Sequence, residues 1–241
     1  MAVELLVAAA MVCCLAAATQ AVTGFGFALM AVPPLAALTD AVQAVVIATV
    51  VGLALTSVSS VRERKHVVTA PASRMVVGGL IGMPLGLVML TQLDESVLTL
   101  LIAGVVIALV LLLAFRVRLP AGAGAQWGSG LASGALLTST GVNGPPLVLT
   151  LQSMQLPPAR SRGTLQTVFW CQELVAVAAL VALGEVDAGV VALAAAGAAV
   201  CPLGWRLGDL LFVRISPSRF RGVVLACLTA SATVSIVSVL A

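Results

Sequence analysis

The stretch TSTGVNGPP at residues 138–146 lies in a segment that is otherwise apolar enough to sit in a lipid bilayer. Glycine is costly inside a helix, and proline removes a hydrogen-bond donor and clashes with the preceding turn, so an α-helix cannot continue here. Unpaired backbone groups are not tolerated against lipid. The stretch is therefore either a surface loop between two spans or a helix break that is buried in protein or lines a water-filled cavity.

A second stretch of the same kind favours the helix break. When VTGFGF at 22–27 is aligned on the first stretch, Gly24 matches Gly141 with an offset of 141 − 24 = 117. Farther along, MPLG at 83–86 matches CPLG at 201–204 with an offset of 202 − 84 = 118. Two independent matches at nearly one offset predict an internal duplication, of the half-and-half kind found in secondary transporters.

The composition indicates a membrane protein. Of the 241 residues, 61% are hydrophobic and 9% are charged, whereas soluble proteins carry about 25% charged residues. No soluble core can bury so much apolar surface, so we predict an all-α polytopic membrane protein, multi-pass in the cell inner (plasma) membrane. The net charge of +3 comes from short basic clusters, which favours a role in topology and no nucleic-acid partner.

Apolar segments and charge clusters alternate along the chain. We expect membrane segments at 3–22, 27–38, 41–61, 72–91, 96–115, 127–140, 145–156, 164–183, 188–205 and 222–240. By the positive-inside rule the basic stretches are cytoplasmic and the acidic turns are outside. The basic stretches are 62–74, 116–118, 160–162 and 206–221, and the acidic turns are 94–95 and 185–187.

This charge pattern predicts two inverted-topology repeats. Each repeat is a broken re-entrant helix pair plus three transmembrane helices, and because three is odd the two repeats have opposite orientation. The expected boundaries are an N-terminal repeat at 1–118, a linker at 119–126 and a C-terminal repeat at 127–241. The two breaks then enter from opposite faces and can meet near the midplane.

At these residues the chain resembles the TauE/SafE family of sulfite exporters. The matching features cover essentially the whole chain and are Gly24-Phe25-Gly26, Pro33-Pro34, Gly134, Gly141, Gly144-Pro145-Pro146-Leu147, Leu156-Pro157-Pro158-Ala159-Arg160 and Arg162-Gly163-Thr164. The resemblance implies movement of small sulfur-containing anions such as sulfite, sulfonates or sulfoacetate. We expect secondary transport by alternating access around the two breaks. The expected partners are the lipid bilayer and a small anion, and a proton or another ion could be coupled to the transport. A homodimer is possible.

The breaks supply the hydrogen-bond donors that an anion needs. Half-helix N-termini offer unpaired N–H groups and a partial positive charge, and Asn143 adds two amide donors. The expected substrate-binding residues are Gln20, Thr23, Gly24, Phe25, Gly26, Thr138, Ser139, Thr140, Gly141, Asn143 and Gly144. Two alternatives stay open: the hydroxyls could hydrogen-bond to their own helix, and Asn143 could be a plain turn residue.

Glu173 is the only acid well inside an expected span, and Gln166 and Gln172 are near it in the sequence. An intramembrane acid is expensive and is a functional candidate by default. We predict that Glu173 carries the coupling proton. It could instead anchor two helices by a hydrogen bond, or lie close to the outer surface.

Other classes of protein fit the sequence less well. We expect no enzyme, no cofactor and no metal site, because the chain has no nucleophile–base pair, no paired carboxylates and no ligand cluster. The alternative that we keep is a membrane thiol-redox carrier using Cys201 with Cys171 or Cys14. A purely structural subunit would leave the duplicated breaks without a purpose. Arg160 and Arg162 could form a cytoplasmic funnel for anions or serve only to set the topology.

Overall fold

The computed structural model describes residues 3–114 and 122–214, and within these residues the elements are helical. They are α1 (Val3–Thr23), α2 (Phe27–Leu38), α3 (Ala41–Glu63), the short 3₁₀ helix η1 (Arg64–His66), α4 (Thr69–Gln92), α5 (Glu95–Ala114), α6 (Ala123–Thr140), α7 (Gly144–Ser153), α8 (Pro158–Ala182) and α9 (Ala188–Arg214). The expected span at 222–240, Cys227, and the arginines at 116, 118, 219 and 221 lie outside the described residues.

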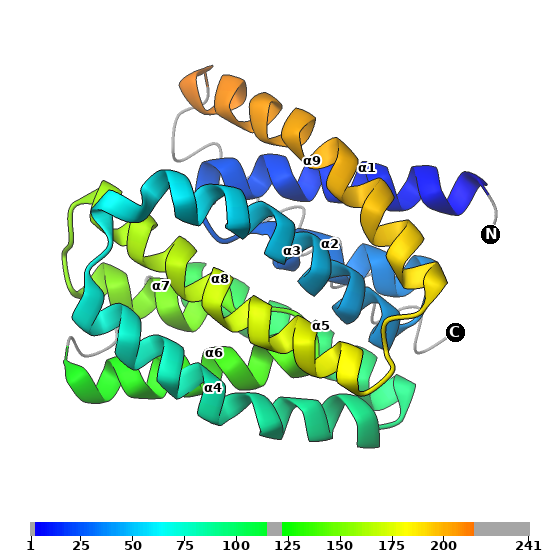
Figure 1. Ribbon diagram of the computed structural model, residues 1–241, viewed down its shortest axis with the longest axis horizontal. Coiled ribbons are helices and arrows are strands. Elements are labelled where there is room, and N and C mark those ends of the chain that lie inside the picture. Colours follow the sequence, from blue (N-terminus) through cyan, green and yellow to red (C-terminus); the bar gives the residue numbers. More distant parts are fainter. Residues whose placement is uncertain (1–2, 115–121, 215–241) are drawn as a thin grey trace.

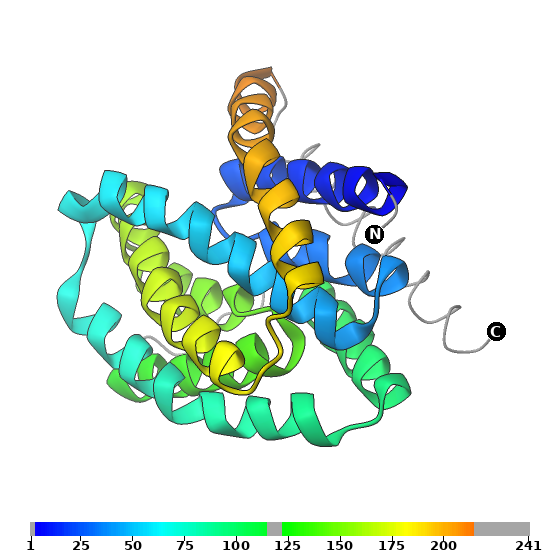
Figure 2. The same cartoon turned by 45° about the vertical axis from the view of Figure 1, so that its right-hand side comes forward.

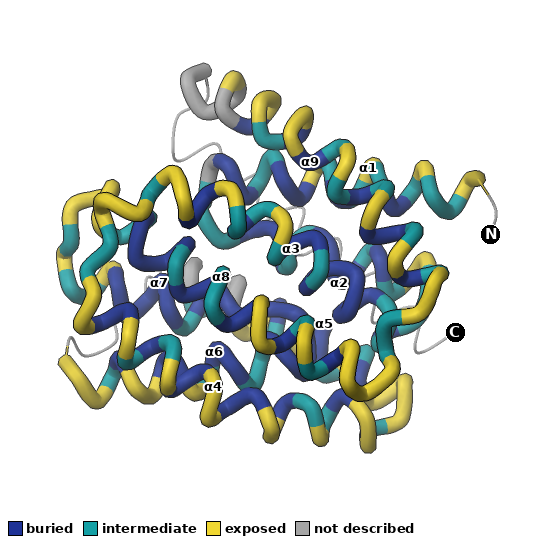
Figure 3. Tube along the Cα trace, in the orientation of Figure 1, coloured by how far each residue is buried: buried dark blue, intermediate teal, exposed yellow. Residues whose placement is uncertain are grey.

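Five helices, α1, α3, α4, α8 and α9, are long and apolar enough to cross a membrane. Their outward faces are apolar, as the exposed stripe Val3, Val7, Met11 and Leu15 on α1 shows. The i, i+4 spacing of this stripe places the four side chains on one face of the helix. Figure 3 shows exposed turns on the outer helices and the most deeply buried backbone in the middle of the bundle. The chain is therefore an all-helical, multi-pass membrane protein.

The long helices pack in three pairs. In Figures 1 and 2, α9 crosses and packs against α1, α4 packs against α6, and α3 packs against α8 in the middle. An offset of 117 or 118 residues carries α1 onto α6 and α4 onto α9. The α1–α9 pair is therefore the counterpart of the α4–α6 pair. The same offset carries α3 onto α8, so the two helices of the central pair are counterparts of each other.

Small residues allow the outer pairs to approach closely. A Cβ atom on Gly82 of α4 or Gly134 of α6 would overlap a backbone carbonyl of the partner helix. The same holds for Gly204 and Gly208 of α9 against α1. Glycine at helix contacts is the usual way in which membrane helices bring their backbones together. These glycines therefore act in packing.

Three expected boundaries were wrong. Helix α6 begins at Ala123, inside the stretch expected to be linker. Helix α8 begins at Pro158 rather than at 164, because proline is well suited to the first turn of a helix. Helix α9 continues to Arg214, so Arg206 lies on a helix and not in a loop. Long basic side chains can extend from a helix end toward water, so charge alone did not mark where these helices stop.

Candidate functional site

The two breaks have the same backbone conformation. Gly24 after α1 has φ 82° and Gly141 after α6 has φ 73°, both in the left-handed region that favours glycine. The N–H of each glycine donates to the carbonyl four residues earlier, over 2.7 Å and 2.9 Å. The next helix is then capped by Gly26 in the first half and by Asn143 in the second. The caps are again 143 − 26 = 117 residues apart.

The two breaks also contact each other. A Cβ atom on Gly144 would lie 3.0 Å from Cβ and 3.1 Å from the carbonyl oxygen of Phe25. Val142 packs with Leu29 and Phe25 in a small apolar cluster. The second break is buried in protein, with each residue from 141 to 145 shielded from solvent. The backbone is thus broken where it faces protein and not lipid, as the membrane requires.

Most of the predicted donor side chains are engaged in holding the breaks together. Thr138 donates to Met83 O over 2.8 Å and to Gly134 O over 3.1 Å. Ser139 and Thr140 each donate to the carbonyl four residues earlier. These hydroxyls therefore follow the self-bonding pattern of helical serine and threonine, and their hydrogens are occupied in this conformation.

At the first break, two predicted side chains act as caps. Thr23 donates to Thr19 O over 2.8 Å, and its oxygen accepts from the N–H of Gly26 over 2.9 Å. Gln20 Oε1 accepts from the N–H of Phe27 over 3.0 Å, so it caps the first residue of α2. Gly26 has an ordinary φ of −84°, but a Cβ atom there would lie 2.7 Å from Thr19 Cγ2. Close packing explains this glycine.

Asn143 differs from the hydroxyl residues in that its side-chain donor is not used in a hydrogen bond within the described residues. It is 5% exposed, and its Nδ2 has no hydrogen-bond partner among the described residues. Its backbone carbonyl accepts from Ser133 Oγ over 3.0 Å, which fixes the residue in place. Pro145 and Pro146 carry no N–H, so the start of α7 has few backbone donors. The Asn143 amide is therefore the main unused donor at the second break.

The carboxyl group of Glu173 lies in the interior, where α3 and α8 meet. Glu173 is 7% exposed. Thr56 donates to its Oε2 over 2.6 Å, and a Cβ atom on Gly52 would lie 3.0 Å from its Oε1. Asn143 is the other side chain beside the carboxyl, although its amide nitrogen is outside hydrogen-bonding geometry. The predicted coupling residue and the predicted anion donor are thus neighbours.

Two glutamines of α8 tie the surrounding helices together. Gln166 accepts from Ser59 Oγ over 2.6 Å and donates to Gly24 O over 2.9 Å. Gln172 accepts from Ser133 Oγ over 2.8 Å and donates to Met75 O over 3.1 Å. Buried polar groups of this kind need their partners to be stable in a low-dielectric interior. Helix α8 is therefore the polar centre of the bundle.

The sequence analysis missed Thr56, Ser59 and Ser133. One signal could have found the first of them. Thr56 and Glu173 are 173 − 56 = 117 residues apart, which is the offset of the two breaks. Ser59 and Ser133 have no such signal in the sequence, because each bonds to a glutamine that is not its counterpart in the duplication.

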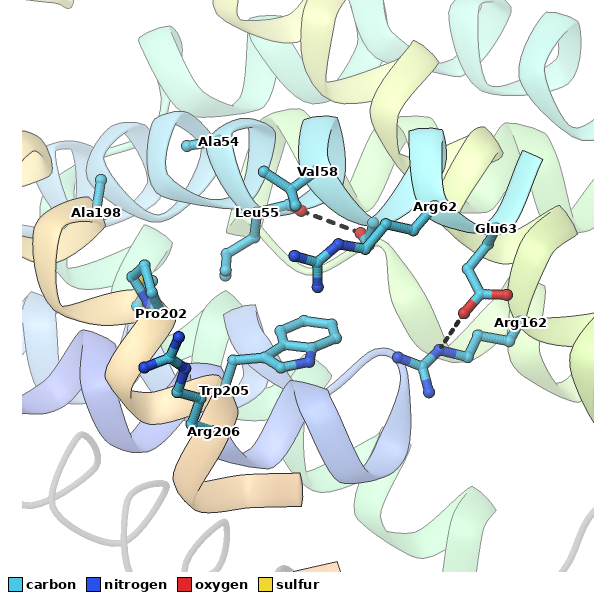
Figure 4. A pocket seen from close by; sticks show the side chains of 12 residues that line it. Ala54, Leu55, Val58, Arg62, Glu63, Arg162, Ala198, Pro202, Trp205 and Arg206 are labelled. Atoms are coloured by element: carbon cyan, nitrogen blue, oxygen red, sulfur yellow. Dashed lines mark hydrogen bonds and ion pairs between the residues drawn. The ribbon is translucent and has the colours of Figure 1, made fainter. Parts of the chain in front are cut away.

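The arginines at 160 and 162 are separated by the structure. Arg162 lines a cleft of about 800 Å³ between α3, α8 and α9 (Figure 4) and a smaller cavity of about 270 Å³ at the first break. Arg160 lines neither cavity and is exposed. Of these two arginines, Arg162 is the one that lines the cavities.

The cysteines are arranged as small apolar residues of the helices, with Cys13 and Cys201 buried and Cys14 and Cys171 half-buried. The four in the described part of the chain, Cys13, Cys14, Cys171 and Cys201, are free thiols. Cys201 donates to Gly197 O over 3.2 Å, within its own helix. In the same part of the chain, no group of three His, Cys, Asp or Glu side chains is placed to hold a metal. The arrangement does not favour the thiol-redox alternative.

An all-helical, multi-pass bundle with long apolar outer helices defines an integral membrane protein, and helix breaks inside such a bundle are found in secondary transporters. A family model agrees with this class. The model described as Sulfite exporter TauE/SafE matches residues 9–234, and the chain belongs to this family. Members of the family are membrane anion transporters and not enzymes. No curated protein and no solved structure matches the chain.

Proposed function

We propose that the protein is a secondary transporter for small sulfur-containing anions such as sulfite, sulfonates or sulfoacetate, and that it works by alternating access around the two breaks. The observation that carries the proposal is the meeting of two breaks with the same backbone beside the buried amide of Asn143, whose Nδ2 has no hydrogen-bond partner among the described residues. A helix that breaks inside protein frees backbone and side-chain groups for a ligand.

The packing of the helices supports an inverted repeat with boundaries near 1–118 and 127–241. The α1–α9 and α4–α6 pairs are counterparts under the offset of the duplication. The left-handed glycines and the caps of the second half-helices are also counterparts. Thr56 and Glu173, which contact each other, are counterparts as well, so they lie on the axis that relates the two halves. A substrate near this axis is reachable from both sides by rocking one half against the other.

Asn143 is the side chain that we assign to the anion. An amide donates two hydrogen bonds and carries no charge that would need to be neutralised when the site is empty. The N–H of Gly144 adds a backbone donor on the same turn. The glycines and the hydroxyls of Thr23, Thr138, Ser139 and Thr140 shape the site, and in a different conformational state their hydroxyls can turn toward the substrate.

Glu173 is the residue that we assign to coupling. An ionised carboxylate and a substrate anion cannot lie side by side in a low-dielectric interior without strong repulsion. A proton on Glu173 removes this repulsion, so proton and anion bind together. The hydrogen bond from Thr56 holds the carboxyl close enough to interact electrostatically with an anion bound by Asn143.

The proposal is tested by transport into liposomes that contain the purified protein. Labelled sulfite, taurine, sulfoacetate and acetate are compared, with and without a pH gradient. We expect faster movement of at least one sulfur anion than in protein-free liposomes, and loss of this movement in Asn143→Asp. Gln92→Ala, at the exposed end of α4, is the matched control. If all of the anions move at the protein-free rate, the proposed function is wrong.

A further inference from the structure

The cleft between α3, α8 and α9 is strongly basic. Three arginines line it, Arg62, Arg162 and Arg206, and Glu63 is the one carboxylate among its described lining residues. Figure 4 shows the three arginines and Trp205 around the cleft, with Glu63 beside Arg162 at one end. Clefts lined by one sign of charge concentrate ions of the opposite sign. The cleft therefore attracts anions.

Arg162 has donor capacity to spare. Its Nε lies 3.5 Å from Glu63 Oε1, close enough for an ion pair, yet this buried nitrogen has no hydrogen-bond partner in the described part of the chain. Its guanidinium lies 5.7 Å from the centroid of the Trp205 ring, which restricts its orientation. A guanidinium has five N–H donors arranged to bind an oxyanion in a bidentate way.

Arg162 connects the cleft with the first break. The smaller cavity that it also lines includes Thr23, Gly24 and Phe25. An anion held by Arg162 thus lies at the common wall of the two spaces.

Apart from Ser59 and Cys201, the remaining wall of the cleft is apolar. Leu55, Val58, Pro202 and Trp205 face it together with two alanines. A volume of about 800 Å³ falls in the range of roughly 300–1,000 Å³ that is usual for sites of small organic ligands. A bare oxyanion would leave most of this apolar wall uncovered.

We propose that this cleft is a second binding site, which takes an organic anion with its charged group on Arg162 and its apolar body against Trp205 and Leu55. The inference rests on the proposed function in one respect, because it makes the cleft the entry of the same transport route. It narrows the substrate class to anions that have an apolar portion. It also assigns separate roles to Arg162 and Arg160.

Tryptophan fluorescence of the purified protein tests the cleft directly. The variant Trp127→Phe/Trp170→Phe keeps Trp205 as its one tryptophan. Methanesulfonate, propanesulfonate, pentanesulfonate and sodium sulfate are the probes. We expect affinity to rise about two- to fourfold for each added methylene that the apolar wall covers. Arg162→Gln should weaken binding tenfold or more, and Arg160→Gln should change it less than twofold.

Three results would overturn the inference. The first is a sulfonate affinity that does not depend on chain length. The second is a loss of affinity in Arg160→Gln as large as that in Arg162→Gln. The third is a Trp205 signal that is saturated in nanodiscs of anionic lipid and unchanged in nanodiscs of zwitterionic lipid. The last result would assign the cleft to a lipid headgroup. Unchanged elution volume and thermal midpoint show that the variants are folded.

Sulfite transport into liposomes, measured alongside Trp205 fluorescence, distinguishes a failure of the cleft inference from a failure of the proposed function. If sulfite is transported but the Trp205 response is unaffected by Arg162→Gln, the cleft inference fails alone. If the sulfonates bind in the cleft as expected but no anion is transported, the proposed function fails alone.

Discussion

Replacing Asn143 by Asp keeps the shape of the side chain and exchanges its two donors for a negative charge. The new carboxylate would lie beside the carboxyl of Glu173 and beside the place assigned to the substrate. At about 4 Å and an effective dielectric constant of about 20, two like charges repel by about 4 kcal/mol. Sulfite affinity should therefore fall about a thousandfold at neutral pH.

The replacement Asn143→Ala should be milder. It removes hydrogen bonds to a charged group, each worth about 1.5–3 kcal/mol, and adds no repulsion. Ser133 donates to the backbone carbonyl of residue 143, so this contact survives in both variants. The expected order of affinity is wild type, then the Ala variant, then the Asp variant.

Acidic pH provides an internal check. Protonation of the introduced carboxyl removes its charge, so the affinity of Asn143→Asp should recover as the pH falls, whereas that of Asn143→Ala should not show this extra recovery. The measurement is isothermal titration of purified protein with sulfite between pH 5 and about pH 8, with Gln92→Ala as control. Equal or tighter sulfite binding by the Asp variant at neutral pH would refute the assignment of Asn143.

Three further predictions concern coupling, the breaks and the topology. Glu173→Gln should transport sulfite without a proton, and its sulfite affinity should change less with pH than that of wild type, because the carboxyl no longer titrates while sulfite still does; a proton-driven rate equal to wild type would make Glu173 a structural anchor only. Gly24→Ala should lower stability by about 1–2 kcal/mol, because a left-handed residue gains a side chain in open space. Gly141→Ala should lower the stability more than Gly24→Ala does, since its Cβ atom would also lie 2.9 Å from Val32 Cγ2. A lower thermal midpoint for Gly24→Ala than for Gly141→Ala would contradict this. Single cysteines replacing Lys65 and Arg160 should both be labelled from the cytoplasmic side, and labelling from opposite sides would exclude the inverted repeat.

The sequence allowed the breaks and most helix positions to be predicted, because the physics behind them is local. The glycines of the first break separate α1 from α2, so the ends of α1 and the limits of α2 were predicted within a residue, although Pro33, Pro34, Pro84 and Pro202 all lie inside helices. The duplication was visible because two short matches lie at nearly one offset. Helix starts beside arginines, as in α8, were less well predicted, since a basic residue is compatible with both a loop and a helix end.

The contacts of the candidate site could not be predicted in this way. The local sequence does not distinguish Thr140, whose hydroxyl bonds to its own helix, from Thr56, whose hydroxyl bonds to Glu173 as well as to its own helix. The difference depends on which face of a helix meets another helix far away in the chain. The cleft is a similar case, because Arg62, Arg162 and Arg206 come together only through the packing of three helices.

The contact between Thr56 and Glu173 has a consequence for the two halves of the chain. A residue on a two-fold axis faces a copy of itself, so a dimer of two identical, oppositely oriented half-length chains would place either two hydroxyls or two acids there. Two acids would repel each other, and two hydroxyls would carry no proton across the membrane. When the two halves differ in sequence, as they do in this single polypeptide, one position supplies the acid and the other its hydrogen-bond donor.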